Sequence, residues 1–148
     1  MAKYLYSCDI PAFVEEGEEW RPVAGTKGLY EVSSVGRVRR TPTTTVEMTS
    51  DGTIIAERSR DYYYLNPTLG CHGYHQLGLT VDGKTTVTAV HILVARAFCE
   101  RLEGSVEVHH IDGISINNRC ENLVWLSADE HGLLHRRKHR RDYLRVAN

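Results

Sequence analysis

Paired cysteines, long apolar runs and a strong net charge are all missing from this 148-residue sequence. No two cysteines lie two or three residues apart, which argues against a zinc ribbon or finger and favours buried free thiols at Cys8, Cys71, Cys99 and Cys120. No run of about 18 apolar residues occurs, and the N-terminus lacks the order of a secretion signal. We therefore expect a cytoplasmic protein without a membrane segment.

The net charge of −1 is a balance between two ends of opposite sign. Residues 1–31 carry six acidic and three basic side chains, whereas residues 131–148 carry six basic side chains and one acidic one. A local excess of positive charge can bind a polyanion whatever the overall balance. The length and the 41% of apolar residues allow one compact domain, or a small domain with an accessory module.

Histidines gather next to the basic end. Five of the eight lie between positions 109 and 139. Imidazole is a common ligand for transition metals and the side chain best suited to move a proton near neutral pH. A histidine cluster flanked by arginines therefore indicates metal-assisted chemistry on a polyanion.

Residues 19–90 read as a β-rich module, and a helix follows it. Alternating apolar and polar residues between turn formers predict strands at 20–23, 29–32, 36–39, 62–65, 74–80 and 85–89. The six threonines and the Asp51-Gly52 pair of residues 41–60 fit a hairpin or a mobile loop equally well. Apolar residues at nearly every position predict a short buried helix over 91–98.

The last part of the chain predicts strand, loop, strand and helix. The strands fall at 106–110 and 123–126, with a loop over 112–121. Ser127 and Glu130 form a capping box that marks the start of the helix. The fold class is therefore α+β, with a small antiparallel β-rich N-terminal module followed by a ββα unit.

Three short stretches carry a resemblance to a known family. The sequence VHHIDG at 108–113, the two asparagines at 117–118 and ENLVW at 121–125 resemble the HNH endonuclease motif of phage and intron-associated enzymes, which has a ββα-metal fold. Residues 19–39 look like the NUMOD4 module that precedes such motifs. The resemblance implies an acidic arm (1–18), a NUMOD4-like DNA-positioning module (19–90) and an HNH catalytic domain with a basic C-terminal helix (91–148).

The same resemblance implies roles for individual residues. His109 would be a metal ligand, His110 the general base that takes a proton from the attacking water, and Asn122 the residue that holds the loop. His131 would be the second metal ligand. One helical turn separates it from His135, which is a candidate third ligand or a solvent- or phosphate-facing residue. The cofactor expected is one divalent metal ion, Mg²⁺ first, with Mn²⁺, Ni²⁺ and Zn²⁺ as alternatives.

The expected activity is metal-dependent hydrolysis of DNA phosphodiester bonds, in a phage-infected bacterial cell. Double-stranded DNA would be the partner; a monomer would nick it, and a homodimer could cut both strands. The alternative is a non-catalytic DNA-binding protein whose histidines, with Cys120, hold a structural zinc ion. Basic side chains from both parts of the chain are candidate DNA contacts: Arg37, Arg39, Arg40, Arg136, Arg137, Lys138, Arg140 and Arg141.

Overall fold

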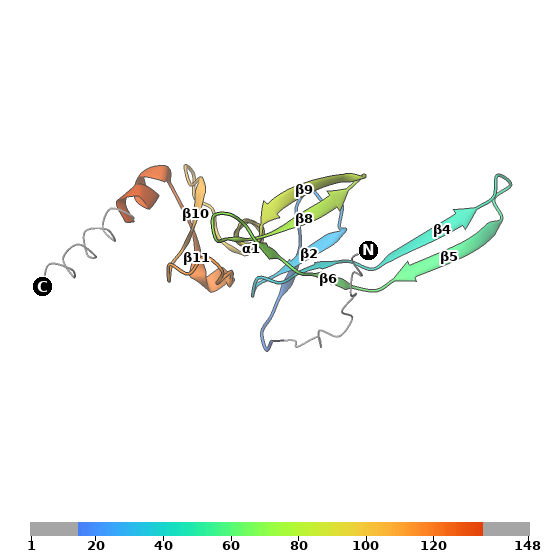
Figure 1. Ribbon diagram of the computed structural model, residues 1–148, viewed down its shortest axis with the longest axis horizontal. Helices are drawn as coiled ribbons and strands as arrows, with labels where there is room; N and C mark the ends of the chain where they lie inside the picture. The colour runs from blue at the N-terminus through green and yellow to red at the C-terminus, as the bar shows by residue number, and fades with distance from the viewer. Residues whose placement is uncertain (1–14, 135–148) are drawn as a thin grey trace, which may run out of the picture.

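The structure is a computed structural model that describes residues 15–134. It has the expected α+β composition (Figure 1), and residues 128–134 are helical. The other elements are, in order, β1 (Trp20–Pro22), β2 (Tyr30–Ser33), β3 (Val38–Arg40), β4 (Thr43–Met48), β5 (Ile54–Arg60), β6 (Tyr63–Leu65), β7 (Thr68–Leu69), β8 (His75–Val81), β9 (Lys84–Ala89), α1 (Val90–Phe98), β10 (Glu107–His110), the 3₁₀ turn η1 (Cys120–Asn122) and β11 (Leu123–Leu126).

The first sheet has four antiparallel strands, in the order β1-β2-β3-β6. Its central strand β2 buries Tyr30 and Val32, and Val32 pairs with buried Val38 of β3. Side chains on a strand alternate between the two faces, so Glu31 points to the opposite face. There it forms an ion pair with its cross-strand partner Arg39. One face of the sheet is thus apolar and packed, and the other carries charge.

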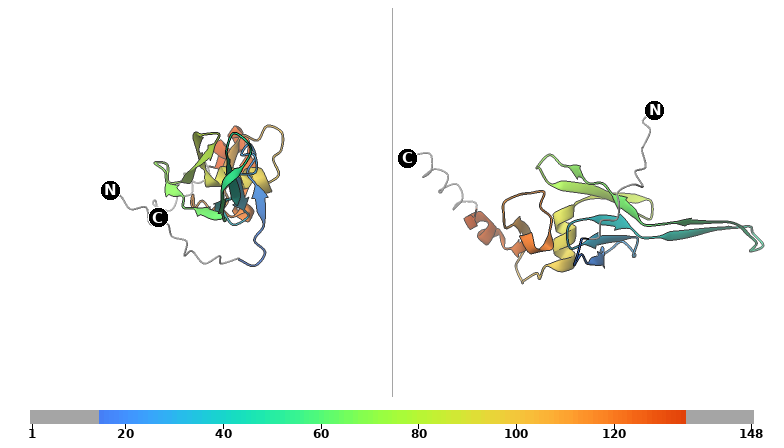
Figure 2. Two further views of the ribbon diagram at one scale, coloured as in Figure 1. Left: turned by 90° about the vertical axis from the view of Figure 1, so that its right-hand side faces the viewer. Right: turned by 90° about the horizontal axis from the view of Figure 1, so that it is seen from below.

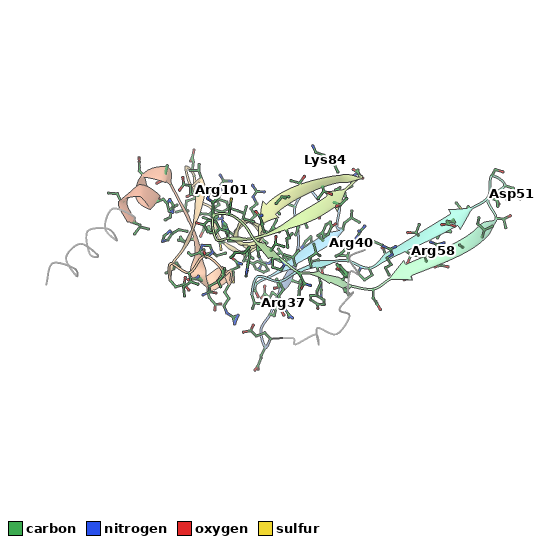
Figure 3. All side chains as sticks on the ribbon, viewed as in Figure 1. Arg37, Arg40, Asp51, Arg58, Lys84 and Arg101 are labelled. Atoms are coloured by element: carbon green, nitrogen blue, oxygen red, sulfur yellow. The ribbon has the colours of Figure 1, made fainter. Side chains whose placement is uncertain are left out.

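Residues 41–60, for which sequence left two options open, contain the hairpin β4–β5. The register runs from Thr43 opposite Arg60 to Met48 opposite Ile54. Gly52 in the turn has a φ of 86°, a conformation that favours glycine. The hairpin projects from the rest of the molecule in Figure 1 and in the right-hand view of Figure 2, with Asp51 at its far end (Figure 3). Most of its side chains are exposed.

A second, three-stranded sheet has the order β7-β8-β9. The β8–β9 turn has positive φ at both Asp82 (49°) and Gly83 (74°), which is the type I′ geometry expected for a two-residue hairpin. The strands predicted at 74–80 and 85–89 are thus confirmed as the two arms of a hairpin. Tyr30 ties the two sheets together, because its hydroxyl donates to the carbonyl of Thr80 at 3.2 Å and accepts from the amide of Thr80 at 3.1 Å.

Helix α1 lies at the centre of the molecule and packs on β2, β8, β9, β10 and β11 (Figure 2). Val90, Val94 and Ala95 are completely buried. The indole Nε1 of Trp125 in β11 donates to the carbonyl of Ala95 at 3.2 Å. Both parts of the chain therefore share one apolar cluster, formed by Val23, Tyr30, Val32, Val38, Leu77, Leu79, Val90, Leu93, Val94, Ala95, Leu123 and Trp125.

The cysteines of the described range are free, as expected, but not all are buried. Cys71 is exposed, while Cys99 and Cys120 are half-buried beside the apolar cluster. The expectation of burial was wrong for Cys71, because it lies in a turn between β7 and β8. Cys8 lies outside the described residues. No helix within residues 15–134 is long and apolar enough to cross a bilayer.

A buried ion pair anchors the segment before β1 to the first sheet. The side chain of Glu18 is fully buried and binds Arg37 through both carboxylate oxygens, with Nε of Arg37 donating at 2.9 Å. Burial acts to raise the pKa of Glu18, but hydrogen bonds from Arg37 and Ser33 and the charge of Arg37 outweigh it and leave the pKa below its usual value. The pair therefore stabilises the fold above about pH 4.5, and this contribution is lost as the pH falls through the lowered pKa.

Replacing Arg37 with alanine should destabilise the protein strongly, because the Glu18 carboxylate would stay buried without its partner. We expect a loss of about 3 kcal/mol in the free energy of unfolding, measured by urea denaturation at pH 7. Arg58→Ala is the matched control, since Arg58 lies on the projecting hairpin (Figure 3) and its contact with Glu47 is long and exposed. That variant should lose less than about 0.5 kcal/mol. Equal losses for the two variants would contradict this view of the Glu18 pair.

Candidate functional site

The hairpin β10–β11 places two adjacent histidines on opposite faces. His109 pairs with Val124 and His110 with Leu123 in a regular antiparallel register. Because side chains alternate along a strand, one imidazole points to each side. His110 points inward and is 5% exposed, whereas His109 is half-buried on the other side. No irregular twist of the strand end is needed to separate them.

His110 lies in a pocket of rings and amides. Its Nε2 is 3.3 Å from Oδ1 of Asn118, which is itself 5% exposed. The ring of Tyr74 stacks on it with centroids 5.8 Å apart, and the ring of His91 meets it edge-on at 5.1 Å. Tyr74 and His91 also contact each other at 4.7 Å. Two aromatic rings thus restrict the orientation of His110.

His91 is the most perturbed histidine of this cluster. It is 7% exposed, and its Nδ1 is buried without a hydrogen-bond partner among residues 15–134. Burial, helped by the neighbouring His110, lowers the pKa of His91 to about 4. His91 is therefore neutral at pH 7 and contributes no charge to the His110 side of the site.

His109 faces the start of the C-terminal helix. Its ring and that of His131 are in edge contact, with centroids 5.2 Å apart. The capping box holds this helix as predicted, because the amide of Ser127 donates to the Glu130 carboxylate at 2.8 Å and the amide of Glu130 donates to the Ser127 hydroxyl at 3.3 Å. The two candidate metal ligands of the described range therefore lie side by side.

A carboxylate, that of Glu107, contacts the ring of His131. Oε2 of Glu107 lies 2.5 Å from Nδ1 of His131. Glu107 is two residues before His109 on the same strand and hence on the same face. Within residues 15–134 no three His, Cys, Asp or Glu side chains are arranged to hold one ion. Two imidazoles with an adjacent carboxylate are the donor set that the described range offers.

Asn122 ties the two ends of the loop between β10 and β11. Its Nδ2 donates to Oδ1 of Asp112 at 3.0 Å and to the carbonyl of Asn117 at 2.9 Å, and its Oδ1 accepts from the amide of Asp112 at 3.0 Å. Hydrogen bonds from the side chain of Asn117 and the amide of Ile114 lower the pKa of Asp112. Asp112 is thus an ionised loop-building residue, and Asn122 at 8% exposure has the position expected of a loop holder.

The predicted DNA contacts divide into two groups. Arg37 and Arg39 lie on one face of the first sheet, over the ring of Trp20 at 5.7 and 3.9 Å. Both already have carboxylate partners in Glu18 and Glu31. Arg40 is half-buried. The other candidates, together with the candidate ligand His135, lie outside the described residues: Arg136, Arg137, Lys138, Arg140 and Arg141.

The structure therefore brings His109, His110, Asn122 and His131 into one hairpin-and-helix unit. Sequence reasoning missed the residues that surround them. Glu107 could have been found from its period-two spacing to His109. Asn118 belongs to the stretch that carries the family resemblance but was given no role there. His75, His91 and Tyr74 have no local signal, because their contacts join distant parts of the chain.

Comparison with known proteins gives two family matches and two relatives. Residues 18–80 match the NUMOD4 motif and residues 88–133 match an HNH endonuclease family. DNA endonuclease I-HmuI of Bacillus phage SP01 is 34% identical over 109 residues, which are 74% of this chain and 52% of that protein. YosQ of Bacillus subtilis strain 168, which is named as a prophage-derived HNH homing endonuclease, is 38% identical over 63 residues, 42% of this chain and 36% of its own.

A solved structure agrees with these relatives. The structure described as DNA binding and cleavage by the HNH homing endonuclease I-HmuI superposes with a TM-score of 0.64 at 30% identity, over 82% of this chain and 59% of that one. The chain thus spans about half the length of I-HmuI and about a third of YosQ.

Replacing His91 with phenylalanine should change how stability depends on pH. In the wild type the unfolded chain takes up a proton at His91 below pH 6.5, while the folded chain does so only near pH 4. Stability from this group is therefore present above pH 6.5 and is lost as the pH falls toward 4, by up to about 3 kcal/mol.

His91→Phe should flatten the fall in unfolding free energy between pH 6.5 and pH 4, measured by urea denaturation at several pH values. His72→Gln is the control, because the side chain of His72 is exposed, and it should keep the wild-type slope. An unchanged slope in His91→Phe would show that His91 is not the buried neutral group described above.

Proposed function

Because this chain belongs to the HNH endonuclease family and carries a NUMOD4 motif, we propose that it is a metal-dependent DNA endonuclease that hydrolyses phosphodiester bonds. The observation that carries the proposal is that the two histidines of β10 lie on opposite faces of the strand. His110 points to one side, and His109 points to the other, where it contacts His131. A general base must keep its lone pair free of the metal ion, and this placement allows that. The two relatives are named as endonucleases of a phage and a prophage, which supports DNA as substrate and an infected bacterial host as the place of action.

In this proposal His110 accepts a proton from the water that attacks the scissile phosphorus. The rings of Tyr74 and His91 hold its imidazole in place, which supports its use as a positioned base. Asn122 keeps the loop after His110 closed through its bonds to Asp112 and Asn117. The chain's own residues thus orient the base before substrate arrives.

The metal site would be formed by His109 and His131, with His135 as the third candidate. Their facing rings fit the role, since imidazole nitrogen is a good ligand for divalent transition metals. When bound, a divalent ion would neutralise charge on the phosphate and stabilise the leaving 3′ oxygen. Two imidazoles favour Mn²⁺ or Ni²⁺ over the Mg²⁺ first expected, because Mg²⁺ prefers oxygen ligands.

Double-stranded DNA is the proposed substrate form, and the sheet face that carries Arg37 and Arg39 is the proposed positioning surface in the described range. Phosphates would have to compete there with Glu18 and Glu31 for the two guanidinium groups. A non-catalytic zinc protein is the other candidate considered from sequence. Cys120, its proposed extra ligand, lies against the apolar cluster, with the thiol of Cys99 3.5 Å from its carbonyl.

A plasmid-nicking assay with Mg²⁺, Mn²⁺ or Ni²⁺ tests the activity. The wild type should convert supercoiled plasmid to nicked or linear form, and His110→Ala should be slower by roughly 100- to 10,000-fold because it lacks the general base. His72→Ala, which changes an exposed histidine outside the site, should cut at the wild-type rate. A wild type that binds DNA without cutting it in any of these metals would favour the non-catalytic alternative.

The contact of Glu107 with His131 generates a second test. Metal-binding histidines are commonly oriented by a carboxylate on their other ring nitrogen, and loss of that partner weakens metal binding by roughly 10- to 100-fold. Glu107→Ala should therefore bind Mn²⁺ at least about tenfold more weakly in calorimetric titration without DNA. The control is Glu103→Ala, which removes an exposed carboxylate from the loop before β10. Unchanged or tighter binding in Glu107→Ala would rule out an orienting role.

A further inference from the structure

Asn118 lies where the NUMOD4 region meets the HNH loop. It is 5% exposed, and its amide group lies between two histidines from different parts of the chain. Its Oδ1 is 3.3 Å from Nε2 of His110, and its Nδ2 is 3.5 Å from Nδ1 of His75 in β8. The side chain therefore links the proposed base to the β-rich module.

The two contacts together select one tautomer of His110. An amide oxygen only accepts hydrogen bonds and an amide nitrogen only donates them. With the amide oriented in this way, Nε2 of His110 carries the proton and Nδ1 of His75 is the acceptor. In a neutral imidazole with a proton on Nε2, the lone pair that can take another proton is on Nδ1.

The NUMOD4 region also contacts Asn118 directly, through the backbone of Gly36. Gly36, in the β2–β3 turn, has a φ of 91°, and a Cβ placed there would be 2.8 Å from Cβ of Asn118 and 3.2 Å from its carbonyl oxygen. Such a contact is too short for two carbon atoms, so only glycine allows this approach. The turn thus fits against Asn118 without a gap for a methyl group.

Two hydrogen bonds fix the loop on either side of this contact. The amide of Cys120 donates to the carbonyl of Ser34 at 2.8 Å, and the hydroxyl of Ser115 donates to the carbonyl of Gly73 at 2.7 Å. Both acceptors belong to the residues that match the NUMOD4 motif. The loop that carries Asn118 is therefore held by a part of the chain other than the HNH region itself.

We propose that Asn118 is a positioning residue for His110, and that the NUMOD4 region, through Gly36 and His75, holds Asn118 in place. This region would then act in the chemical step as well as in DNA positioning. The inference rests on the proposed endonuclease function, in which His110 is the base. The part of the inference that concerns the tautomer of His110 can be tested without measuring DNA cleavage.

The test compares two alanine substitutions of glycines with similar backbone strain. Gly36→Ala introduces a methyl group against Asn118, whereas Gly25→Ala, at a φ of 79°, introduces one with no other atom within 4 Å. Full-length Gly36→Ala should lose roughly tenfold or more of its single-turnover cleavage rate, because a misplaced general base forfeits part of its effect. Its Kd for DNA should change less than about twofold, since no cationic side chain is altered. Gly25→Ala should match the wild type in both.

Asn118→Ala provides the second arm, in the same assays. It should show the same loss of rate at unchanged Kd, and adding Gly36→Ala to it should cause little further loss, because the two act through one contact. Equal rates for Gly36→Ala and Gly25→Ala, or full activity of Asn118→Ala, would overturn the proposal.

Long-range ¹H–¹⁵N NMR of the His110 ring separates this inference from the proposed function. The wild type should show the tautomer with the proton on Nε2, and Asn118→Ala should show a mixture. If the wild type does not cut DNA but gives this spectrum, the proposed function fails while the positioning contact stands. The opposite tautomer in the wild type would overturn the positioning role. Because this measurement uses the wild type, it tests the proposal even if the Gly36→Ala variant does not fold.

Discussion

Helix α1 packs on three separate β-elements at once, and the placement of the site depends on that packing. Val90 and Val94 are fully buried between the first sheet, the β8–β9 hairpin and the β10–β11 hairpin. The β10–β11 hairpin has only two strands, and such a pair is marginally stable alone in water. The bond from Trp125 to Ala95 and the shared apolar cluster fix it against the β-rich module. The histidines of β10 are therefore positioned by residues from the whole described chain.

The same packing explains why Nδ1 of His91 is buried without a hydrogen-bond partner among the described residues. His91 follows Val90 at the start of α1, so its ring is carried into the space between Tyr74 and His110. Leaving a polar nitrogen unpaired in the interior costs stability. In return the ring fills the space beside His110 while staying neutral. A positively charged group in this position would repel a protonated His110, whereas a neutral ring restricts its motion without opposing its charge.

Local features were predictable from the sequence, and long-range contacts were not. The capping box at Ser127 and the Asp82-Gly83 turn depend on neighbouring residues, so their residue types suffice to predict them. The hairpin over 41–60 is largely exposed, and with few buried positions its pattern could not exclude a loop. The contact between Asn118 and His75 joins residues 43 positions apart. Nothing in either residue's own surroundings predicts it.

The resemblance to HNH enzymes gave the correct unit and assigned a catalytic role and a metal-binding role to adjacent residues of one strand. The regular pairing through His110 places these two side chains on opposite faces. Two adjacent histidines on one face would both be drawn to a metal ion, and the base would lose its lone pair to coordination. Placement on opposite faces keeps the backbone of β10 between them, so His110 stays with Asn118 while His109 faces His131. The alternation of a β-strand is thus the physical reason why two identical side chains, one residue apart, can serve as base and as ligand.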